Sequence, residues 1–345
     1  MHRRYYSVVI IISSLISSAQ ADPREQMLLR NIRQITFPSM GFEKAGESYF
    51  SPDGKMLLFQ AVPTGKKQYQ IYSIDIEKGK PRLISTGCGA CTCAYFRPDG
   101  KKIIFASSHS APDNQESNLN VPGYQRESKN YVWKFTPYMN IYEANPDGSN
   151  LVALTTGLAY KAECSYSWDG ARIVFASNAS GNMNLYTMNA DGSDMQQITH
   201  TTTSYNGGPF FSPSGEKIIF RADYEKKDYL QIYSIDCQTQ KIQQLTTNGS
   251  VNWAPFWHHN GHVIVFTTSL HGHHQYELYL LNTITNDLHR LTYNPGFDGM
   301  ASFNRQGTQI TWTSKRGLDK TCQVFVADFT MPACLATPVK ESDEQ

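Results

Sequence analysis

Short segments rich in β-branched and aromatic residues alternate along the chain with tight polar turns. In one representative stretch, the turn Arg97-Pro98-Asp99-Gly100 is followed by Lys-Ile-Ile-Phe-Ala at residues 102–106. Runs of about four to eight such residues, bounded by Gly, Pro, Asn or Asp, are typical of β-strands. Proline and glycine fix the dihedral angles of the turns between them. The pattern therefore predicts an all-β protein.

A turn of the form S-P-D-G recurs six times, and its glycines are Gly54, Gly100, Gly170, Gly215, Gly261 and Gly307. Successive glycines lie 46, 70, 45, 46 and 46 residues apart, so that one interval holds an insertion. An aromatic-rich strand precedes each turn and a β-branched strand follows it. A third strand comes about fifteen residues later, as at 70–74, and a short fourth strand that ends in threonine closes the unit, as at 196–199.

A single four-stranded antiparallel sheet cannot bury both of its faces, so neighbouring sheets must stack on it. Six sheets arranged radially bury every face and leave only short edges. The repeat therefore predicts a six-bladed β-propeller of four-stranded antiparallel blades. The alternative is a β-sandwich with coincidental turns, which six in-register copies disfavour.

The two ends of the repeat region complement each other. The sixth unit has a third strand at 323–327, but Met331-Pro332 and a polar tail follow where a fourth strand is expected. Residues 32–36 match the fourth strands of other units and have no strand before them. We expect this N-terminal strand to complete the last blade, because that pairing removes two open edges.

The first 21 residues are typical of a secretory signal peptide. Arg3 and Arg4 precede an apolar stretch, and Ala19-Gln20-Ala21 has the form of a cleavage site. We expect cleavage near Ala21 and a periplasmic or secreted protein; the arginine pair leaves Sec and twin-arginine export open.

The expected domains follow from these boundaries. They are a signal peptide at 1–21, one propeller at 22–329 with an insertion at about 109–139 in the second blade, and a flexible tail at 330–345. No second run of about 18 apolar residues exists, so no membrane span is expected. The 31 Lys and Arg balance the 30 Asp and Glu, which disfavours a nucleic-acid partner.

The seven cysteines suit an oxidising compartment, and their odd number leaves at least one thiol unpaired within a monomer. The clustered Cys88, Cys91 and Cys93 resemble half of a metal site, but no second pair with suitable spacing exists. Disulfides are the favoured interpretation. The candidate pairs are Cys91 or Cys93 with Cys164, and Cys322 with Cys334.

The repeat resembles that of the TolB-like propellers, whose unit reads roughly F-S-P-D-G-K-x-I-x-F, then I-Y-x-M-D-x-D-G, then L-T. The resemblance covers about residues 31–329, and stand-alone exported members share segments such as 205–213 and 296–299. It implies a propeller and a role in protein binding. The N-terminal domain of TolB itself is not expected here, because the repeats begin just after the signal. A hydrolase domain is not expected either, because G-x-S-x-G is absent.

Candidate functional residues lie where the innermost strands begin, nine and seven residues before each turn glycine. We expect a ring of polar side chains from different blades at the mouth of the central tunnel: Glu47, Lys161, Glu163, Asn206, Asn252 and Asp298. Such a ring suits a charged peptide end, a sugar or a divalent cation in the tunnel. The alternative is a hydrated polar lining that binds no ligand.

The insertion in the second blade joins strands whose loops share a face with these positions. Its later part carries aromatic and basic residues of the kinds found at binding hot spots: Tyr124, Arg126, Tyr131, Trp133 and Tyr138. The alternative is that these rings only pin the insertion onto its blade.

Six of the ten histidines lie within a 17-residue stretch of the fifth unit. His271, His273 and His274 form a weak candidate site for zinc or copper. They occupy one turn, so solvated side chains are the favoured interpretation and no metal or other cofactor is expected.

The sequence favours an exported module that binds an envelope or extracellular protein, a peptide or a small ligand. One alternative is a small enzyme, a lyase or hydrolase acting on a glycan or peptide at the tunnel mouth, with carboxylates near a lysine for acid–base work. No nucleophile–base pair or recognised catalytic signature supports it, and we assign no catalytic residue. A purely structural scaffold is the third hypothesis.

Overall fold

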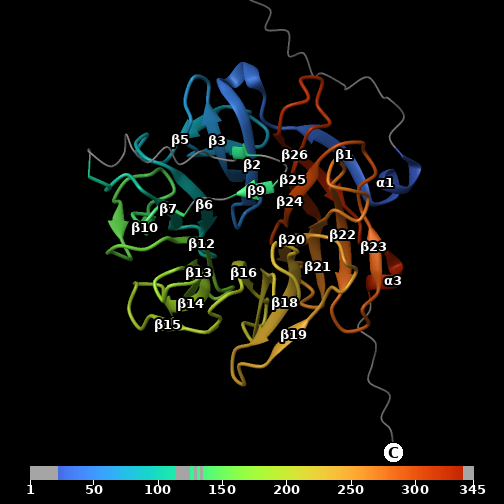
Figure 1. Cartoon of the computed structure of the whole chain (residues 1–345). Helices are drawn as coiled ribbons and strands as arrows, with labels where there is room; N and C mark the ends of the chain where they lie inside the picture. Colours follow the sequence, from blue (N-terminus) through green and yellow to red (C-terminus); the bar gives the residue numbers. More distant parts are fainter. Residues whose placement is uncertain (1–21, 113–124, 128–129, 133–134, 337–345) are drawn as a thin grey trace, which may run out of the picture.

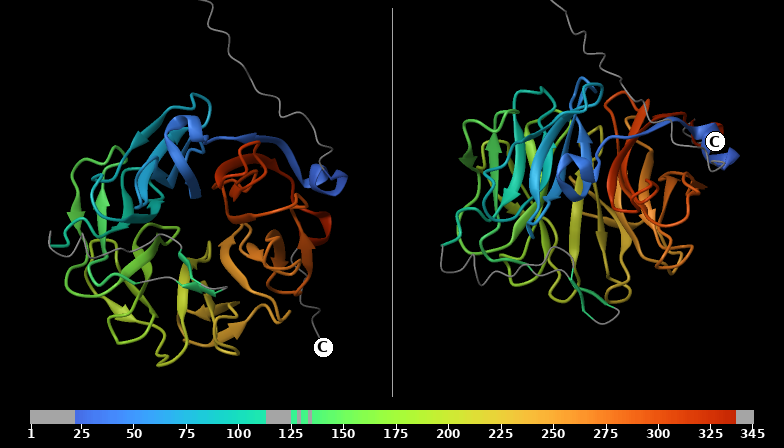
Figure 2. Two further views of the ribbon diagram at one scale, coloured as in Figure 1. Left: turned by 45° about the horizontal axis from the view of Figure 1, so that its top comes forward. Right: turned by 90° about the horizontal axis from the view of Figure 1, so that it is seen from above.

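Six four-stranded sheets surround a central axis in the computed structural model, which describes residues 22–112, 125–127, 130–132 and 135–336 (Figures 1 and 2). The prediction of an all-β, six-bladed propeller with antiparallel blades is confirmed. None of the helices in these ranges is long and apolar enough to cross a membrane.

The first three blades use chain-consecutive strands, apart from the hairpin in blade 2. Blade 1 contains β2 (Phe42–Phe50), β3 (Met56–Pro63), β4 (Gln70–Asp75) and β5 (Pro81–Leu83). Blade 2 contains β6 (Cys91–Phe96), β7 (Ile103–Ser107), β10 (Asn140–Ala144) and β11 (Val152–Ala153). Blade 3 contains β12 (Lys161–Tyr166), β13 (Arg172–Ser177), β14 (Asn184–Asn189) and β15 (Gln196–Gln197).

The last three blades include the closing one. Blade 4 contains β16 (Asn206–Phe211), β17 (Lys217–Ala222), β18 (Gln231–Asp236) and β19 (Ile242–Gln244). Blade 5 contains β20 (Asn252–Trp257), β21 (Val263–Thr268), β22 (Glu277–Asn282) and β23 (Leu288–Arg290). Blade 6 contains β24 (Asp298–Phe303), β25 (Gln309–Ser314), β26 (Gln323–Phe329) and β1 (Leu29–Gln34).

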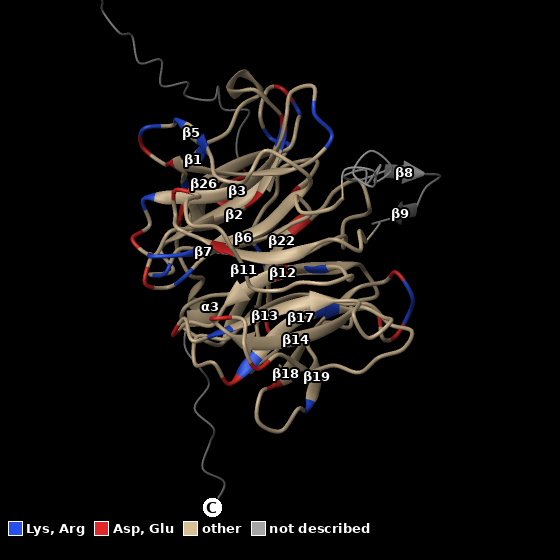
Figure 3. Cartoon of the chain, turned by 90° about the vertical axis from the view of Figure 1, so that its left-hand side faces the viewer, with Lys and Arg blue, Asp and Glu red and all other residues tan. Residues whose placement is uncertain are grey.

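The propeller has two ends, which we name for what they carry. The turn face carries the S-P-D-G turns. The insertion face carries the loops after each second and fourth strand, including the hairpin of β8 (Gln125–Glu127) and β9 (Asn130–Val132), which projects from this end (Figure 2). The charged side chains lie mainly in loops and outer strands, with both signs interspersed (Figure 3).

The apolar core repeats with the blades. The second strand of each blade buries an aromatic ring almost completely, five residues after the turn glycine: Phe59, Phe105, Phe175, Phe220, Phe266 and Trp312. Each ring lies opposite an aromatic residue of the third strand: Tyr72, Tyr142, Tyr186, Tyr233, Tyr279 and Phe325. The ring centroids of these pairs are 5.6–6.4 Å apart, within the range of favourable aromatic contacts.

A hydroxyl group ties the fourth strand to the third in every blade. It donates to the side chain that begins the third strand: Ser85 to Gln70, Thr155 to Asn140, Thr199 to Asn184, Thr246 to Gln231, Thr292 to Glu277 and Thr36 to Gln323. The same hydroxyl accepts the next backbone N–H of that strand. The threonine at the end of the fourth strand, visible in the sequence, is therefore a structural clasp.

The clasp of blade 6 is supplied by the N-terminal segment. β1 pairs antiparallel with β26, with Leu29 opposite Phe329 and Gln34 opposite Phe325. Figure 1 shows this first strand beside the last strand of the chain. Closure by the N-terminal strand is confirmed, although the strand covers 29–34 rather than 32–36, because Thr36 turns inward as the clasp.

The chain after β26 turns back onto the propeller. The short helix α3 (Ala333–Ala336) places Leu335 in the core, fully buried, and the Leu335 carbonyl lies 3.3 Å from His262 Nε2. The first part of the segment that we expected to be a flexible tail is therefore anchored, and residues 337–345 lie outside the described residues.

We expect Thr36→Val to lower the free energy of unfolding by about 1–3 kcal/mol, because it leaves the buried Gln323 Oε1 and Val324 N–H without a partner. Chemical denaturation of the whole chain measures this change. Thr330→Val, at an exposed residue beside the closing strand, is the control and should be close to neutral. Equal effects of both substitutions would contradict the role of the clasp.

Candidate functional site

Every innermost strand contains a bulge at the same place, seven residues before its turn glycine. The bulge residues adopt left-handed backbone angles, with φ between 48° and 58°: Glu47, Cys93, Glu163, Gly208, Ala254 and Met300. The pairing register with the second strand shifts at each of these positions. Non-glycine residues rarely adopt this conformation, and a bulge of this kind re-aims a side chain. Here it turns six equivalent positions toward the axis.

An aromatic cluster fills the axis two residues further along the innermost strands. Tyr49, Tyr95, Phe210 and Phe256, from blades 1, 2, 4 and 5, contact one another with ring centroids 5.0–6.0 Å apart. We call these four residues the aromatic plug. They form the floor beneath the bulge residues, which lie nearer the insertion face.

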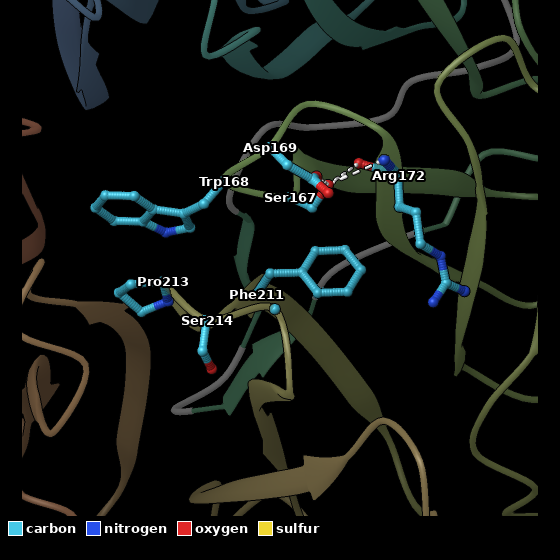
Figure 4. A pocket seen from close by; sticks show the side chains of 8 residues that line it. Ser167, Trp168, Asp169, Arg172, Phe211, Pro213 and Ser214 are labelled. Atoms are coloured by element: carbon cyan, nitrogen blue, oxygen red, sulfur yellow. Dashed lines mark hydrogen bonds between the residues drawn. The ribbon is translucent and has the colours of Figure 1, made fainter.

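The turn-face end of the axis is covered by a contact between opposite blades. The Arg305 guanidinium of blade 6 lies 5.4 Å from the ring centroid of Trp168 in blade 3, a cation–π distance. A shallow recess of about 110 Å³ lies beside it, lined by Trp168, Phe211 and Pro213 among others (Figure 4). This recess is separated from the bulge residues by the plug, so the functional argument concerns the insertion face.

Glu163 is held at the axis by three groups. Its carboxylate accepts from Arg221 Nη2 at 2.7 Å, from the Tyr205 hydroxyl at 3.1 Å and from the Gly208 backbone N–H at 2.5 Å. Arg221 Nη2 lies 2.8 Å from the Tyr205 hydroxyl as well. The ion pair joins blades 3 and 4, and its side chains are only 13% and 16% exposed.

Glycine is required at two positions of blade 4 that lie against the Glu163–Arg221 ion pair. A Cβ atom on Gly208 would overlap the Arg221 guanidinium, and one on Gly207 would overlap the Tyr205 hydroxyl and the Glu163 carboxylate. The two glycines therefore leave the space in which Arg221 reaches across its own strand to the axis. Arg221 was not among the predicted site residues.

Glu47 lies on the axis with fewer partners. Its Oε1 accepts from the Tyr49 hydroxyl at 3.4 Å, which is a long hydrogen bond. Burial, with a smaller contribution from the negative charge of Glu163, raises the pKa of Glu47 to about 7. Cys93 and Arg221 also act on this carboxyl group, so residues of blades 1, 2, 3 and 4 surround it.

The four other predicted ring residues lie two residues before the bulge positions, closer to the insertion face, where the strands make contacts between blades. They are Lys161, Asn206, Asn252 and Asp298. In all six blades, the backbone N–H nine residues before the turn glycine donates to a carbonyl of the preceding blade. The acceptor is the residue immediately before the third strand of that blade. Lys161 Nζ donates to the Thr156 carbonyl at 3.0 Å, and burial lowers its pKa. The Asn206 and Asn252 amides donate to groups of the preceding blade or its loop.

Asp298 belongs to a separate network that anchors the N-terminus. It accepts from Trp312 Nε1 at 3.0 Å and from Arg316 Nη2 at 2.8 Å. The other guanidinium nitrogen of Arg316 pairs at 2.7 Å with Glu25, in helix α1 (Pro23–Leu28). The structure thus brings Glu47 and Glu163 together. Asp298 is not part of this pair, because its carboxylate is already paired with Arg316.

The described residues contain no group of three His, Cys, Asp or Glu side chains that could hold a metal ion. Two carboxylates reach the axis instead of the three expected, and Arg221 supplies the positive charge beside them. The histidine trio lies exposed in the turn after β21, where His271 bonds to Tyr279 and His273 to Tyr276.

The predicted disulfides are not formed, since all seven cysteines are free thiols in the structure. Cys91 Sγ lies 3.1 Å from the Ser107 hydroxyl. Cys164 is near Cys93, as expected, but its thiol faces the Cys93 carbonyl at 3.7 Å. Burial raises the pKa of these three thiols, so they are not activated nucleophiles.

The end of the insertion lies beside the axial residues. Phe135 packs edge-on against Tyr160, with ring centroids 4.9 Å apart, and stacks on Tyr205 at 6.3 Å. Tyr205 in turn bonds to Glu163. Of the predicted loop residues, Tyr138 follows Phe135 in the chain and is half-buried. Tyr124 and Trp133 lie outside the described residues, while Arg126 and Tyr131 lie on the backbone of the β8–β9 hairpin.

These features define the chain as a six-bladed β-propeller closed by its N-terminal strand, with a charged cluster on the axis. No family model matches it. It is 26% identical over 192 residues to the uncharacterized protein Atu1656 of Agrobacterium fabrum, covering 50% of this chain and 63% of that protein. It is 31% identical over 84 residues to the Tol-Pal system protein TolB of Francisella tularensis subsp. mediasiatica, covering 24% and 19%. The chain therefore spans less than two thirds of each relative's length.

Solved structures place the fold among the TolB-like propellers. A TolB-type protein from Agrobacterium tumefaciens aligns with TM-score 0.58 and 17% identity over 83% of this chain and 91% of its own. TolB from Acinetobacter baumannii aligns with TM-score 0.54 and 18% identity over 82% and 63%. An oligogalacturonate lyase in complex with manganese aligns with TM-score 0.53 and 15% identity over 88% and 94%. The chain therefore has the six-bladed β-propeller fold of these TolB structures, and at these identities the likeness concerns the fold alone.

Glu47→Gln should stabilise the protein above pH 7. The carboxyl group titrates near 4.5 when unfolded and at about 7 when folded, so stability falls as pH rises between these values. The substitution should raise the free energy of unfolding by up to about 3 kcal/mol at alkaline pH and should make that free energy less dependent on pH. Glu43→Gln, at an exposed carboxylate on the same strand, is the control. A wild-type pH profile in the Glu47→Gln variant would contradict the assignment.

Gly208→Ala should lower the free energy of unfolding more than Gly215→Ala does. Thermal or chemical denaturation measures the difference. Both glycines have positive φ in blade 4, which costs an alanine about 1–2 kcal/mol. Only at Gly208 would the new methyl group displace Arg221, because Gly215 has no atom within 4 Å of that position. If both variants lost equal stability, the ion pair with Glu163 would not depend on this space.

Proposed function

We propose that this protein is an exported binding module that receives a partner protein or peptide on its insertion face. The observation that carries the proposal is the charged cluster of Glu47, Glu163 and Arg221, which lies between that face and the aromatic plug. Charged groups held in partial burial at an axis are suited to recognising a complementary group. The signal-like pattern of residues 1–21 supports export to the periplasm or beyond.

The insertion supports the same face. Phe135 connects it to Tyr205 and thus to the axial cluster. Two large apolar side chains are strongly exposed in separate loops of this face, Leu158 at 74% and Leu318 at 93%. A partner docked on this face would bury these apolar side chains, and the charged axial groups would add specificity. The similar structures include TolB from Acinetobacter baumannii, which supports a role in protein binding by analogy of fold.

Acid–base catalysis is a second candidate, favoured by one observation. Glu47 has a pKa of about 7 and lies beside a carboxylate paired with arginine, an arrangement that can supply a proton donor near neutral pH. The likeness to an oligogalacturonate lyase makes an acidic glycan the first substrate to assay. If Glu47→Gln and Glu163→Gln left every glycan-degrading activity of the protein unchanged, this candidate would be lost.

Photo-cross-linking in the native envelope tests the binding role. A cross-linking residue at position 158 or 318, on the insertion face, should give a partner adduct that a deletion of 110–136 weakens. The matched controls are positions 195 and 284, where Met195 and Ile284 are exposed apolar residues on the turn face. Adducts from the turn face alone would overturn the proposal. Absence of adducts from all four positions would favour a structural scaffold.

A further inference from the structure

The axial cluster contains one carboxylate without a cation. Glu163 is bonded to Arg221, Tyr205 and the Gly208 N–H. In contrast, no Lys or Arg of the described residues forms an ion pair with Glu47, whose direct hydrogen bond comes from the Tyr49 hydroxyl at 3.4 Å. A partly buried carboxylate without an ion-pair partner is costly, and proteins retain such groups mainly where they act.

The groups around Glu47 set the sign of the local charge. They come from the first four blades: Tyr49 on its own strand, Cys93 on β6, Glu163 on β12 and Arg221 on β17. Tyr205, just before β16, bonds to both Glu163 and Arg221. Burial raises the pKa of the Cys93 thiol, which stays neutral. Two carboxylates therefore face one guanidinium, and the axis carries an excess negative charge when Glu47 is ionised.

The remaining surfaces are apolar or aromatic. Ala254 and Met300 are the bulge residues of blades 5 and 6, and both keep partial exposure. The plug below contributes aromatic rings, and Tyr49 joins the plug to Glu47 directly. Aromatic rings with a neighbouring carboxylate form the recurrent binding site for organic cations.

A divalent metal ion fits this site less well. The lone pairs of Glu163 are occupied by three donors, which leaves one free carboxylate, whereas calcium takes six or more oxygen ligands. The Arg221 charge would also oppose a divalent ion. A single compact positive charge on an apolar stem matches one carboxylate, the small side chain of Ala254 and the thioether of Met300.

We infer that the axial site binds an alkylammonium group, a lysine side chain or peptide N-terminus of the partner, which pairs with Glu47 above the aromatic plug. The inference rests on the proposed function and names the chemical group of the partner that the insertion face recognises. Binding is coupled to ionisation of Glu47, because the ammonium attracts the carboxylate and not the protonated acid. Affinity therefore rises with pH through the titration of Glu47, while Arg221 stays charged and the Cys93 thiol stays neutral, since the pKa of each is raised.

Three small probes test this on the full mature chain by NMR, with the Glu side-chain carboxyl carbons labelled. Nα-acetyl-lysine amide carries only the side-chain ammonium, alanine amide only the N-terminal ammonium, and Nα-acetyl-norleucine amide neither. We expect one or both ammonium probes to shift the Glu47 resonance and lower its pKa. Binding should be about tenfold weaker at pH 6 than at pH 8 for Nα-acetyl-lysine amide. For alanine amide the factor should be about fivefold, because an α-amino group titrates near pH 8 and about half of it is uncharged there. The two ammonium probes distinguish a lysine from an N-terminus.

The variants make the result specific. Glu47→Gln, which we expect to be at least as stable as wild type, should weaken binding by at least about tenfold and abolish its pH dependence. Glu43→Gln on the same strand should change neither. Equal binding of the norleucine probe, no binding of either ammonium probe, or unchanged affinity in Glu47→Gln would overturn the inference. Cross-links from positions 158 and 318 that persist in that case would leave the proposed function standing.

Discussion

A four-stranded blade has two apolar faces and can cover neither of them alone. Each blade therefore depends on its neighbours, and the ring is stable only when the first and last blades meet. The described structure meets this requirement with six aromatic pairs, six hydroxyl clasps and six backbone hydrogen bonds between adjacent blades. Because the clasp of blade 6 uses Thr36, residues nearly 290 positions apart must come together before the axis has a fixed geometry.

The fixed axis is what allows strained groups to persist on it. Left-handed backbone angles at Glu47, Cys93 and Glu163 are unfavourable for side-chain-bearing residues, and they survive only where the surroundings determine them strongly. In four blades the N–H of the bulge residue donates to a side chain of the preceding blade, as from Glu47 to Thr313 at 3.0 Å. Contacts between blades thus hold the same bulges that turn the axial side chains inward.

The sequence predicted the fold well because the fold is periodic. Turn glycines at nearly constant spacing fixed the number of blades, and the unmatched strand near Thr36 indicated closure. The site was predicted only in part, because its residues break the period. Arg221 reaches the axis from the second strand of blade 4, through the space left by Gly208. Asp298 is paired with Arg316 and is therefore not available at the axis. Counting from turn glycines finds equivalent positions, but it cannot show which of them a long side chain from elsewhere will occupy or neutralise.

The contrast between Glu163 and Glu47 separates structure from function on this axis. Glu163 has the partners of a structural ion pair, and removing Arg221 would leave a buried charge at a cost of several kcal/mol. Glu47 contributes nothing comparable, and above neutral pH its ionised form opposes folding. A group that destabilises the free protein and faces a partly open axis is better explained by an interaction with something outside the chain than by packing. The propeller can hold this group because six mutually supporting blades supply far more stability than one carboxylate removes.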